Sequence, residues 1–141
     1  MKYILDCSVA LKGVLPEVDS AKAIRLLKEY RHTIHELLAP DIFPPEVANG
    51  LATAERQARI QPGEAGIFLA DLMQNAPVIH SSTPLLARAI EISVADKQAV
   101  YDCIYLALAE SEGCEMVSAD DAFVRKMRGK FPFLVRLGDL P

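Results

Sequence analysis

Two acidic residues lie where a parallel sheet would place its ligand-binding groups. Asp6 directly follows the apolar segment from Lys2 to Leu5, and Asp120 follows a second such segment that ends at Ser118. Both segments are typical of short buried strands. In open parallel sheets, ligands bind beyond the carboxyl ends of the strands, where the strand order reverses. Because an acid after a strand is most often a helix cap or a turn residue, either aspartate alone would predict little.

Asp102 gives a stronger physical signal. On a helix its side chain shares a face with Tyr105, Leu106 and Ala109, an apolar stripe that is typical of a buried surface. Free N–H groups and the helix dipole in a first turn stabilise a carboxylate in such a place. This structural explanation accounts for Asp102 alone, but not for several acids together.

Glu46 stands directly after Pro45, in the first turn of another predicted helix. It shares a face with Asn49, Gly50 and Thr53, which are small or polar residues. Such a face is usually solvated. If it instead faces the ends of the strands, Glu46 and Asn49 point to the same place as the aspartates that follow the strands.

Several carboxylates in one place repel one another strongly, and proteins tolerate this when a hard cation or protons neutralise them. Oxygen ligands favour Mg²⁺ or Mn²⁺ over zinc. Such ions position a phosphate, lower the pKa of a bound water and stabilise the leaving oxygen of an in-line displacement. We expect water to be the nucleophile, because no Ser or Cys has a His suitably placed to act as its base.

The elements that hold these residues alternate between strand and helix. We predict strands at 2–5, 36–39, 77–80, 115–118 and 134–137. Helices are predicted after Pro16 with Ser20 as N-cap, from 46 to about 61, and at 64–74, 82–90, 101–112 and 121–128, whereas the segment 6–8 is predicted as a loop. The alternation implies right-handed crossovers, and therefore an α/β fold: a three-layer α/β/α sandwich with a mostly parallel central sheet.

Composition limits the class of protein. A chain of 141 residues that is 51% hydrophobic can bury one core, so we predict a single domain over residues 1–141. A net charge of −4 argues against nucleic-acid binding by bulk electrostatics, so any such contact must be local. One basic cluster qualifies, although such clusters are usually a solvated face. It consists of Arg125, Lys126, Arg128 and Lys130.

The cysteines and the apolar runs indicate where the protein works. Cys7, Cys103 and Cys114 lack the spacing of a zinc site or a disulfide framework, which favours a reducing cytoplasm. We interpret Cys7 and Cys103 as core residues. Asp6 and Lys12 interrupt the apolar N-terminus, so we expect no signal peptide. The longest apolar run, 103–109, is far shorter than the roughly 18 residues that span a bilayer, so we expect no membrane contact.

Four blocks of the chain resemble, in the right order, the acidic blocks of PIN-domain proteins, especially the VapC-type toxins. These blocks are ILDCSV at 4–9, PEVAN at 45–49, YDCIYLALAE at 101–110 and VSADDAF at 117–123. No single block is specific to this family. Four blocks in this order and at the spacing of a whole domain are specific, and the block around Asp102 carries the most weight.

The resemblance implies an acidic metal site for Mg²⁺ or Mn²⁺, with Asp6 and Asp102 as direct ligands. It also implies endonucleolytic hydrolysis of single-stranded or structured RNA and a cognate antitoxin, and we further expect a homodimer. The basic cluster is then a candidate RNA-binding surface. The metal site would comprise Asp6, Glu46, Asp102 and Asp120, and the groups that hold its carboxylates or waters would be Ser8, Asn49 and Ser118.

The chain departs from the family pattern at two positions, and its sequence also allows three alternative functions. Gly13 stands where many relatives carry a large aromatic residue and Asp121 where Glu is common, and we interpret both as bearing on substrate preference. The alternatives are a housekeeping RNA-processing nuclease without an antitoxin, a non-catalytic binding module and a phospho-acceptor receiver domain. A receiver needs a pair of acids after its first strand, and no adjacent pair follows Leu5.

Overall fold

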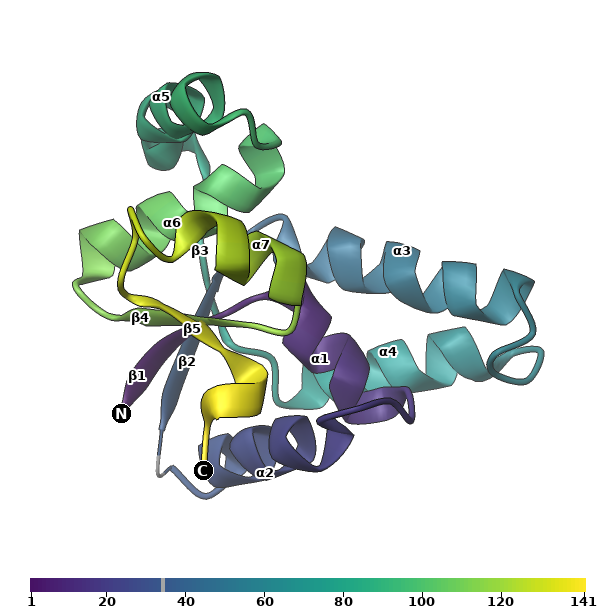
Figure 1. Ribbon diagram of the computed structural model, residues 1–141. Helices are drawn as coiled ribbons and strands as arrows, with labels where there is room; N and C mark the ends of the chain where they lie inside the picture. The colour runs from purple at the N-terminus through teal and green to yellow at the C-terminus, as the bar shows by residue number, and fades with distance from the viewer. Residues whose placement is uncertain (34) are drawn as a thin grey trace.

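The computed structural model describes residues 1–33 and 35–141, and its centre is a five-stranded sheet (Figure 1). The strands stand in the order β3-β2-β1-β4-β5, and every pairing is parallel. The chain builds outward from β1 to β3 and then returns to the other side of β1, so the order reverses between β1 and β4. The strands are β1 (Lys2–Leu5), β2 (Glu36–Pro40), β3 (Val78–His80), β4 (Glu115–Ser118) and β5 (Leu134–Arg136).

Helices cover both faces of this sheet, which confirms the predicted three-layer α/β/α sandwich. Figure 1 shows α6 and α7 on one face and α1 and α2 on the other, while α5 packs outside α6 and the α3–α4 hairpin extends away from the sheet. None of the helices in the described ranges is long and apolar enough to cross a membrane. The helices are α1 (Cys7–Val14), α2 (Ser20–Arg31), α3 (Phe43–Arg56), α4 (Glu64–Gln74), α5 (Leu86–Asp96), α6 (Val100–Glu112) and α7 (Asp121–Met127).

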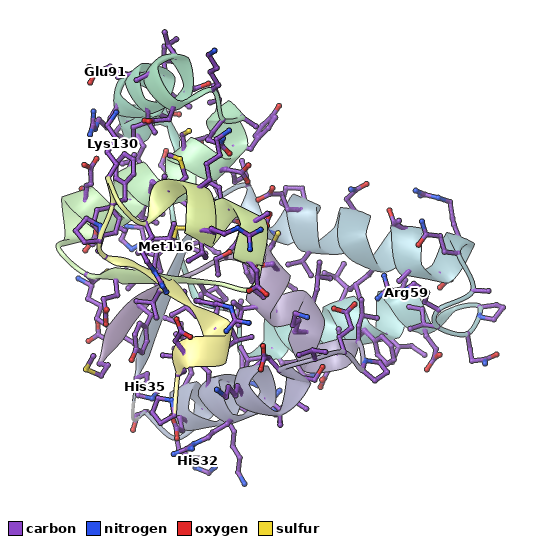
Figure 2. The ribbon with its side chains drawn as sticks, viewed as in Figure 1. His32, His35, Arg59, Glu91, Met116 and Lys130 are labelled. Carbon is purple, nitrogen blue, oxygen red and sulfur yellow. The ribbon has the colours of Figure 1, made fainter. Side chains whose placement is uncertain are left out.

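The core lies on both sides of the sheet. Parallel strands covered on both faces have nearly continuous apolar sequences, and β1, β2 and β4 follow this rule. Met116 of β4 is fully buried near the middle of the molecule (Figure 2). Residues 103–109 of α6 are buried all round, because this helix lies between the sheet and α5. The helix is therefore a fixed support for whatever its first turn presents.

The prediction of a loop at 6–8 was wrong, because α1 begins at Cys7 directly after β1. Val9 and Ala10 of this helix are buried against α2 and α3. A helix of eight residues is marginal by itself and is stabilised by tertiary packing. A local pattern therefore misses it, and its first turn lies next to the end of β1.

Other boundaries differ by smaller amounts. Ser20 is the first residue of α2 and not its N-cap, and its hydroxyl donates to the Leu15 carbonyl and accepts from the Glu17 N–H. The helix α3 begins at Phe43, three residues before the prediction, because prolines fit well within a first helical turn. Ser82 is the residue before a 3₁₀ turn, Thr83–Leu85, and this turn leads into α5.

Candidate functional site

Asp6 lies at the point where the strand order reverses. Its backbone N–H donates to the Val117 carbonyl over 3.1 Å, so the end of β1 is tied to the end of β4. Its carboxylate accepts two hydrogen bonds at Oδ2, from the Ser8 hydroxyl at 2.7 Å and from the Ser118 hydroxyl at 2.8 Å. Although it precedes α1, the carboxylate does not cap that helix.

The two serines connect Asp6 to the segment that carries Asp120. The Ser8 hydroxyl accepts from the Ala119 N–H at 3.0 Å, and the Ser118 hydroxyl accepts from the Asp120 N–H at 3.1 Å. Ser118 is completely buried. The structure thus places Ser8 and Ser118 where the sequence predicted supporting groups, between one carboxylate and the backbone of another.

Asp120 is the N-cap of α7, and its Oδ1 accepts from the Phe123 N–H at 3.1 Å. This is the common structural role of an acid after a strand. A carboxylate has two oxygens and several acceptor sites, so this bond leaves Oδ2 available. Capping therefore fixes the direction of the Asp120 side chain without using up its capacity to bind.

Asp102 and Glu46 come from two other helices. Asp102 is partly buried in the first turn of α6, and no hydrogen bond to its carboxylate is recorded within the described residues. Glu46 is partly buried in the first turn of α3, and its Oε1 accepts from the Tyr105 hydroxyl at 2.7 Å. The helix α3 thus turns Glu46 inward, toward α6, and not into solvent.

The pKa shifts show that the four acids form one electrostatic group. Burial raises the pKa of Asp102 to about 6, and the charges of Asp6 and Asp120 add to the rise. Burial also raises the pKa of Asp6, against the serine hydrogen bonds that lower it, and Asp120 raises it further. The pKa of Glu46 is raised by burial and by the charges of Asp6 and Asp102, against the lowering effect of Tyr105. No cation appears among these causes.

The four carboxylates are near one another without forming a closed cage. Within residues 1–33 and 35–141, no three acidic, cysteine or histidine side chains already gather closely enough to hold an ion by themselves. Mg²⁺ usually keeps several waters and takes only one or two protein carboxylates. An open, oxygen-only donor set of this kind fits such a hydrated ion better than zinc, which favours nitrogen and sulfur ligands.

A wide-open, largely apolar cavity of about 490 Å³ includes Glu46, one of the four acids. Glu46 and Asn49 contribute its polar groups, and Tyr101 forms part of its wall. Asn49 is exposed, and no hydrogen bond links it to a carboxylate in the part of the chain that the structure describes. The structure therefore brings Asn49 to the site as a cavity residue, and its predicted support of the carboxylates stays a prediction.

Two of the four residues of the basic cluster form ion pairs within the protein, so they are less available for RNA contact than the sequence suggests. Arg128 pairs with Asp139 at 2.8 Å, and Lys130 pairs with Asp96 at 3.2 Å, close to α5 (Figure 2). Arg125 and Lys126 are exposed on α7. Asp121, one of the two departures noted above, accepts from Arg136 at 2.9 Å. Arg125 and Lys126 are thus the members of the cluster that are most available for RNA contact.

Two residues beside the acids serve packing. Cys103 is fully buried, as predicted, and Cys7 is partly buried with a raised pKa, chiefly because of burial, so it stays a thiol.

A Cβ at Gly13 would lie 2.7 Å from Leu27 Cδ1, where α1 crosses α2. The missing side chain at Gly13 therefore has a packing explanation at the contact between these helices, and its bearing on substrate preference stays a prediction.

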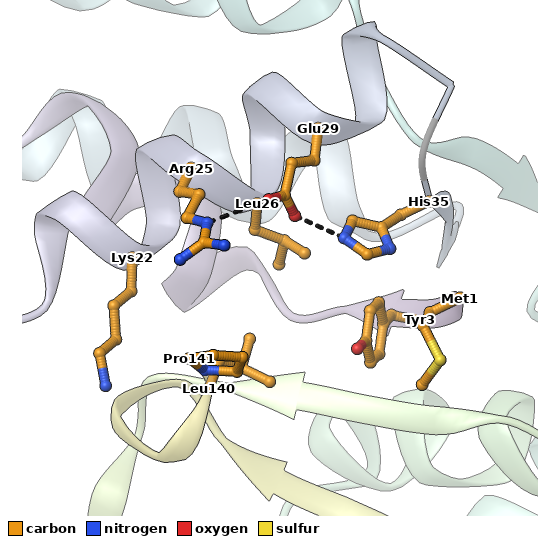
Figure 3. A pocket seen from close by; sticks show the side chains of 9 residues that line it. All are labelled: Met1, Tyr3, Lys22, Arg25, Leu26, Glu29, His35, Leu140 and Pro141. Carbon is orange, nitrogen blue, oxygen red and sulfur yellow. Dashed lines mark hydrogen bonds and ion pairs between the residues drawn. The ribbon is translucent and has the colours of Figure 1, made fainter.

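A second cavity, of about 290 Å³, lies between α2, the start of β1 and the C-terminal residues (Figure 3). Glu29 is the acid of this cavity. It accepts from His35 Nε2 at 2.5 Å and from Arg25 at 3.0 Å, and these two bonds, His35 first, lower its pKa. The ring of His35 also packs edge-on against Tyr3, with centroids 5.5 Å apart. Glu29 is thus already bonded to two basic side chains of the protein itself.

Comparison with known proteins identifies the family. The PIN-domain family model matches residues 3–128, so the chain belongs to the PIN-domain family, as its sequence predicted. Among characterised proteins it is 31% identical to ribonuclease VapC3 of Pyrobaculum aerophilum over 137 residues, which is 96% of this chain and 98% of that protein. Its fold matches the crystal structure of PAE2754 from Pyrobaculum aerophilum with a TM-score of 0.73 and 21% identity, over 98% of this chain and 85% of that one.

Sequence reasoning missed two site residues on α6. Tyr105 was counted only as a member of an apolar stripe, although its hydroxyl meets Glu46. A buried tyrosine hydroxyl almost always requires a partner, which is the signal that was available. Tyr101, next to Asp102, was not singled out at all, although it is 63% exposed.

Proposed function

We propose that this protein is a metal-dependent endoribonuclease and the toxin of a type II toxin-antitoxin pair. The observation that carries the proposal is the electrostatic group at the strand ends: Asp6, Glu46 and Asp102 have raised pKa values because they are buried near other carboxylates. Such an arrangement is costly unless it binds a cation. The likeness to ribonuclease VapC3 over nearly the whole chain supports the reaction and the biological role.

The acids are assigned to Mg²⁺ or Mn²⁺, with Asp6 and Asp102 as direct ligands and with Asp120 and Glu46 as ligands or as acceptors for bound water. When bound, the ion supplies an activated water and stabilises the oxygen that leaves phosphorus. The protein's own part is to hold the carboxylates in place. Ser8 and Ser118 fix Asp6, the α7 N-terminus fixes Asp120, and Tyr105 fixes Glu46.

RNA cleavage by purified protein tests the reaction. Wild-type protein should cut RNA with Mn²⁺ and not with EDTA, and sequencing of the product ends should show defined internal cuts. Asp6→Asn and Asp102→Asn should lower cleavage to the EDTA background while the protein stays folded. Asp71→Asn is the matched control, because Asp71 is an exposed acid on α4. Undiminished cleavage by both site variants would overturn the proposal.

The role as a toxin has its own test, because a housekeeping nuclease would have the same site. Expression of this protein alone should arrest growth, and co-expression of a small neighbouring reading frame should relieve the arrest. A partner that covers the cleft should offer a basic or apolar segment, since the chain carries a net charge of −4 and the cleft is acidic. Normal growth on expression of active protein would favour the housekeeping enzyme.

The remaining assignments follow the same proposal. We place the protein in the reducing cytoplasm, which its three free cysteines suit. The homodimer stays a prediction that sedimentation of purified protein will test. If Arg125 and Lys126 contact RNA, replacing both by Ala should weaken RNA binding and reduce its salt dependence, whereas Arg128 and Lys130 are held by acids of the protein itself.

A further inference from the structure

Tyr101 differs from the other aromatic residues of this protein. Of the Phe and Tyr side chains in the described ranges, Tyr101 alone is exposed, at 63%, whereas Tyr3, Phe43 and Tyr105 are buried in the core. The ring stands in the first turn of α6, one residue before Asp102. The fold thus places an exposed tyrosine ring one residue before a proposed metal ligand.

The cavity that Tyr101 borders has the character of a site for a flat neutral group. Its other walls are largely apolar and include Leu11, Ile42 and Pro45. Its lining contains no Lys or Arg, and its one charged residue is Glu46. A phosphate would be repelled there unless a metal held it, but a nucleobase carries no charge and would bury its face against these walls. Asn49 at the rim has both a donor and an acceptor, which suits the edge of a base.

The cavity is continuous with the acids, because Glu46 belongs to both. A nucleotide whose phosphate lies next to Glu46 therefore has this cavity beside it. Proteins that bind single-stranded RNA stack unpaired bases on aromatic rings and contact the base edges with polar side chains. An exposed tyrosine and an amide beside a phosphodiester-cleaving site match both requirements.

We propose that this cavity is a nucleobase subsite, in which a base next to the scissile phosphate stacks on Tyr101 and presents its edge to Asn49. This inference rests on the proposed ribonuclease function and adds a residue that positions the substrate and one that selects it. Neither residue has to touch the metal or the attacking water. Their loss should therefore change substrate binding and choice more than the chemical step.

The test combines protein variants with altered RNA. Cleavage kinetics are measured on an oligoribonucleotide that contains the mapped cut, with each of the two flanking nucleotides intact or abasic. Tyr101→Ala should raise KM for the intact RNA roughly ten-fold with little change in kcat. For wild-type protein, KM should rise by the same factor when one flanking base is removed. Tyr101→Ala acting on that abasic RNA should show no further rise in KM. Tyr101→Phe should behave as wild type, and so should Ile67→Ala, a control that is 66% exposed on α4.

Asn49→Ala should flatten the preference among the four bases at the same position, measured as relative kcat/KM. A second readout does not depend on turnover. An RNA with 2-aminopurine at that position should lose fluorescence on binding to wild-type protein with Mn²⁺, read by stopped flow before cleavage, because stacking quenches the probe, and should keep it with Tyr101→Ala. This pair of proteins reports the subsite even if the reaction is misassigned.

Three results would overturn the subsite. The first is an unchanged KM in Tyr101→Ala, and the second is a further rise in KM when this variant acts on the abasic RNA. The third is an effect of Tyr101→Ala on the sedimentation of the protein alone, which would mark the ring as a contact between proteins. Failure of the proposed function is distinguishable, because wild-type protein would then cut no RNA with Mn²⁺.

Discussion

The acids at the strand ends and the acid of the α2 cavity have opposite electrostatic surroundings. At the strand ends, Asp6, Glu46 and Asp102 are partly buried beside further carboxylates, and their pKa values are raised. At the α2 cavity, Glu29 is bonded to His35 and Arg25, and its pKa is lowered (Figure 3). An acid that is paired within the protein supports the fold. The strand-end acids have no cationic partner among the causes of their pKa shifts, which matches the proposed metal site, and this difference distinguishes them from Glu29.

The first test breaks the support of the strand-end acids without removing a carboxylate. Ser118→Ala deletes the buried hydroxyl that donates to Asp6 and accepts from the Asp120 N–H. Groups that orient ligands typically contribute roughly 10- to 100-fold to metal affinity or activity. We expect Mn²⁺ affinity to fall by a factor in that range. The matched control is Ser93→Ala on α5, whose hydroxyl donates to the Gln98 carbonyl, and it should leave the affinity unchanged.

The second test uses the stability of metal-free protein as a function of pH. The pKa of Asp102 rises from 3.8 to about 6 on folding, so the folded chain binds more protons than the unfolded chain between these values. Stability in EDTA should therefore fall as the pH rises through this range. Urea unfolding at either end of the range measures the effect, and Asp102→Asn should reduce it. Parallel pH profiles for wild type and Asp102→Asn would contradict the electrostatic account.

The third test addresses the α2 cavity and should give the smallest effect. Glu29→Gln removes a charge that His35 and Arg25 hold near the surface, and exposed ion pairs contribute little. Because the pKa of Glu29 is lowered on folding, its stabilisation is present above the ordinary value of 4.5 and is lost as the pH falls below it. We expect a small decrease in the thermal midpoint at neutral pH and unchanged cleavage. A large loss of cleavage would mean that the two cavities are coupled.

The same comparison explains what could be predicted from the sequence. Asp6, Asp102 and Asp120 were singled out because a strand end or an apolar helical stripe marks an acid that ordinary solvation does not explain, and the structure places them in one electrostatic group with Glu46. Glu46 remained ambiguous, since its direction depends on how α3 packs, and the Tyr105 hydroxyl that settles this is 59 residues away. No local pattern contains such a contact.

The errors have related causes. The helix α1 was missed because its eight residues are stabilised by packing on α2 and α3. The ion pairs of Arg128 and Lys130 also escaped sequence reasoning, since Lys130 meets Asp96 across 34 residues, and the RNA-binding role of both residues stays a prediction. The exposure of Tyr101 likewise depends on the tertiary structure.

The central claim is that the strand-end acids bind a divalent cation, and calorimetric titration with Mn²⁺ tests it most directly. Wild-type protein and Asp71→Asn should bind Mn²⁺ with equal affinity and release protons near pH 6, where Asp102 is partly protonated. Asp102→Asn should bind far more weakly and release fewer protons. Absence of binding by wild-type protein, or equal binding by all three proteins, would contradict the account.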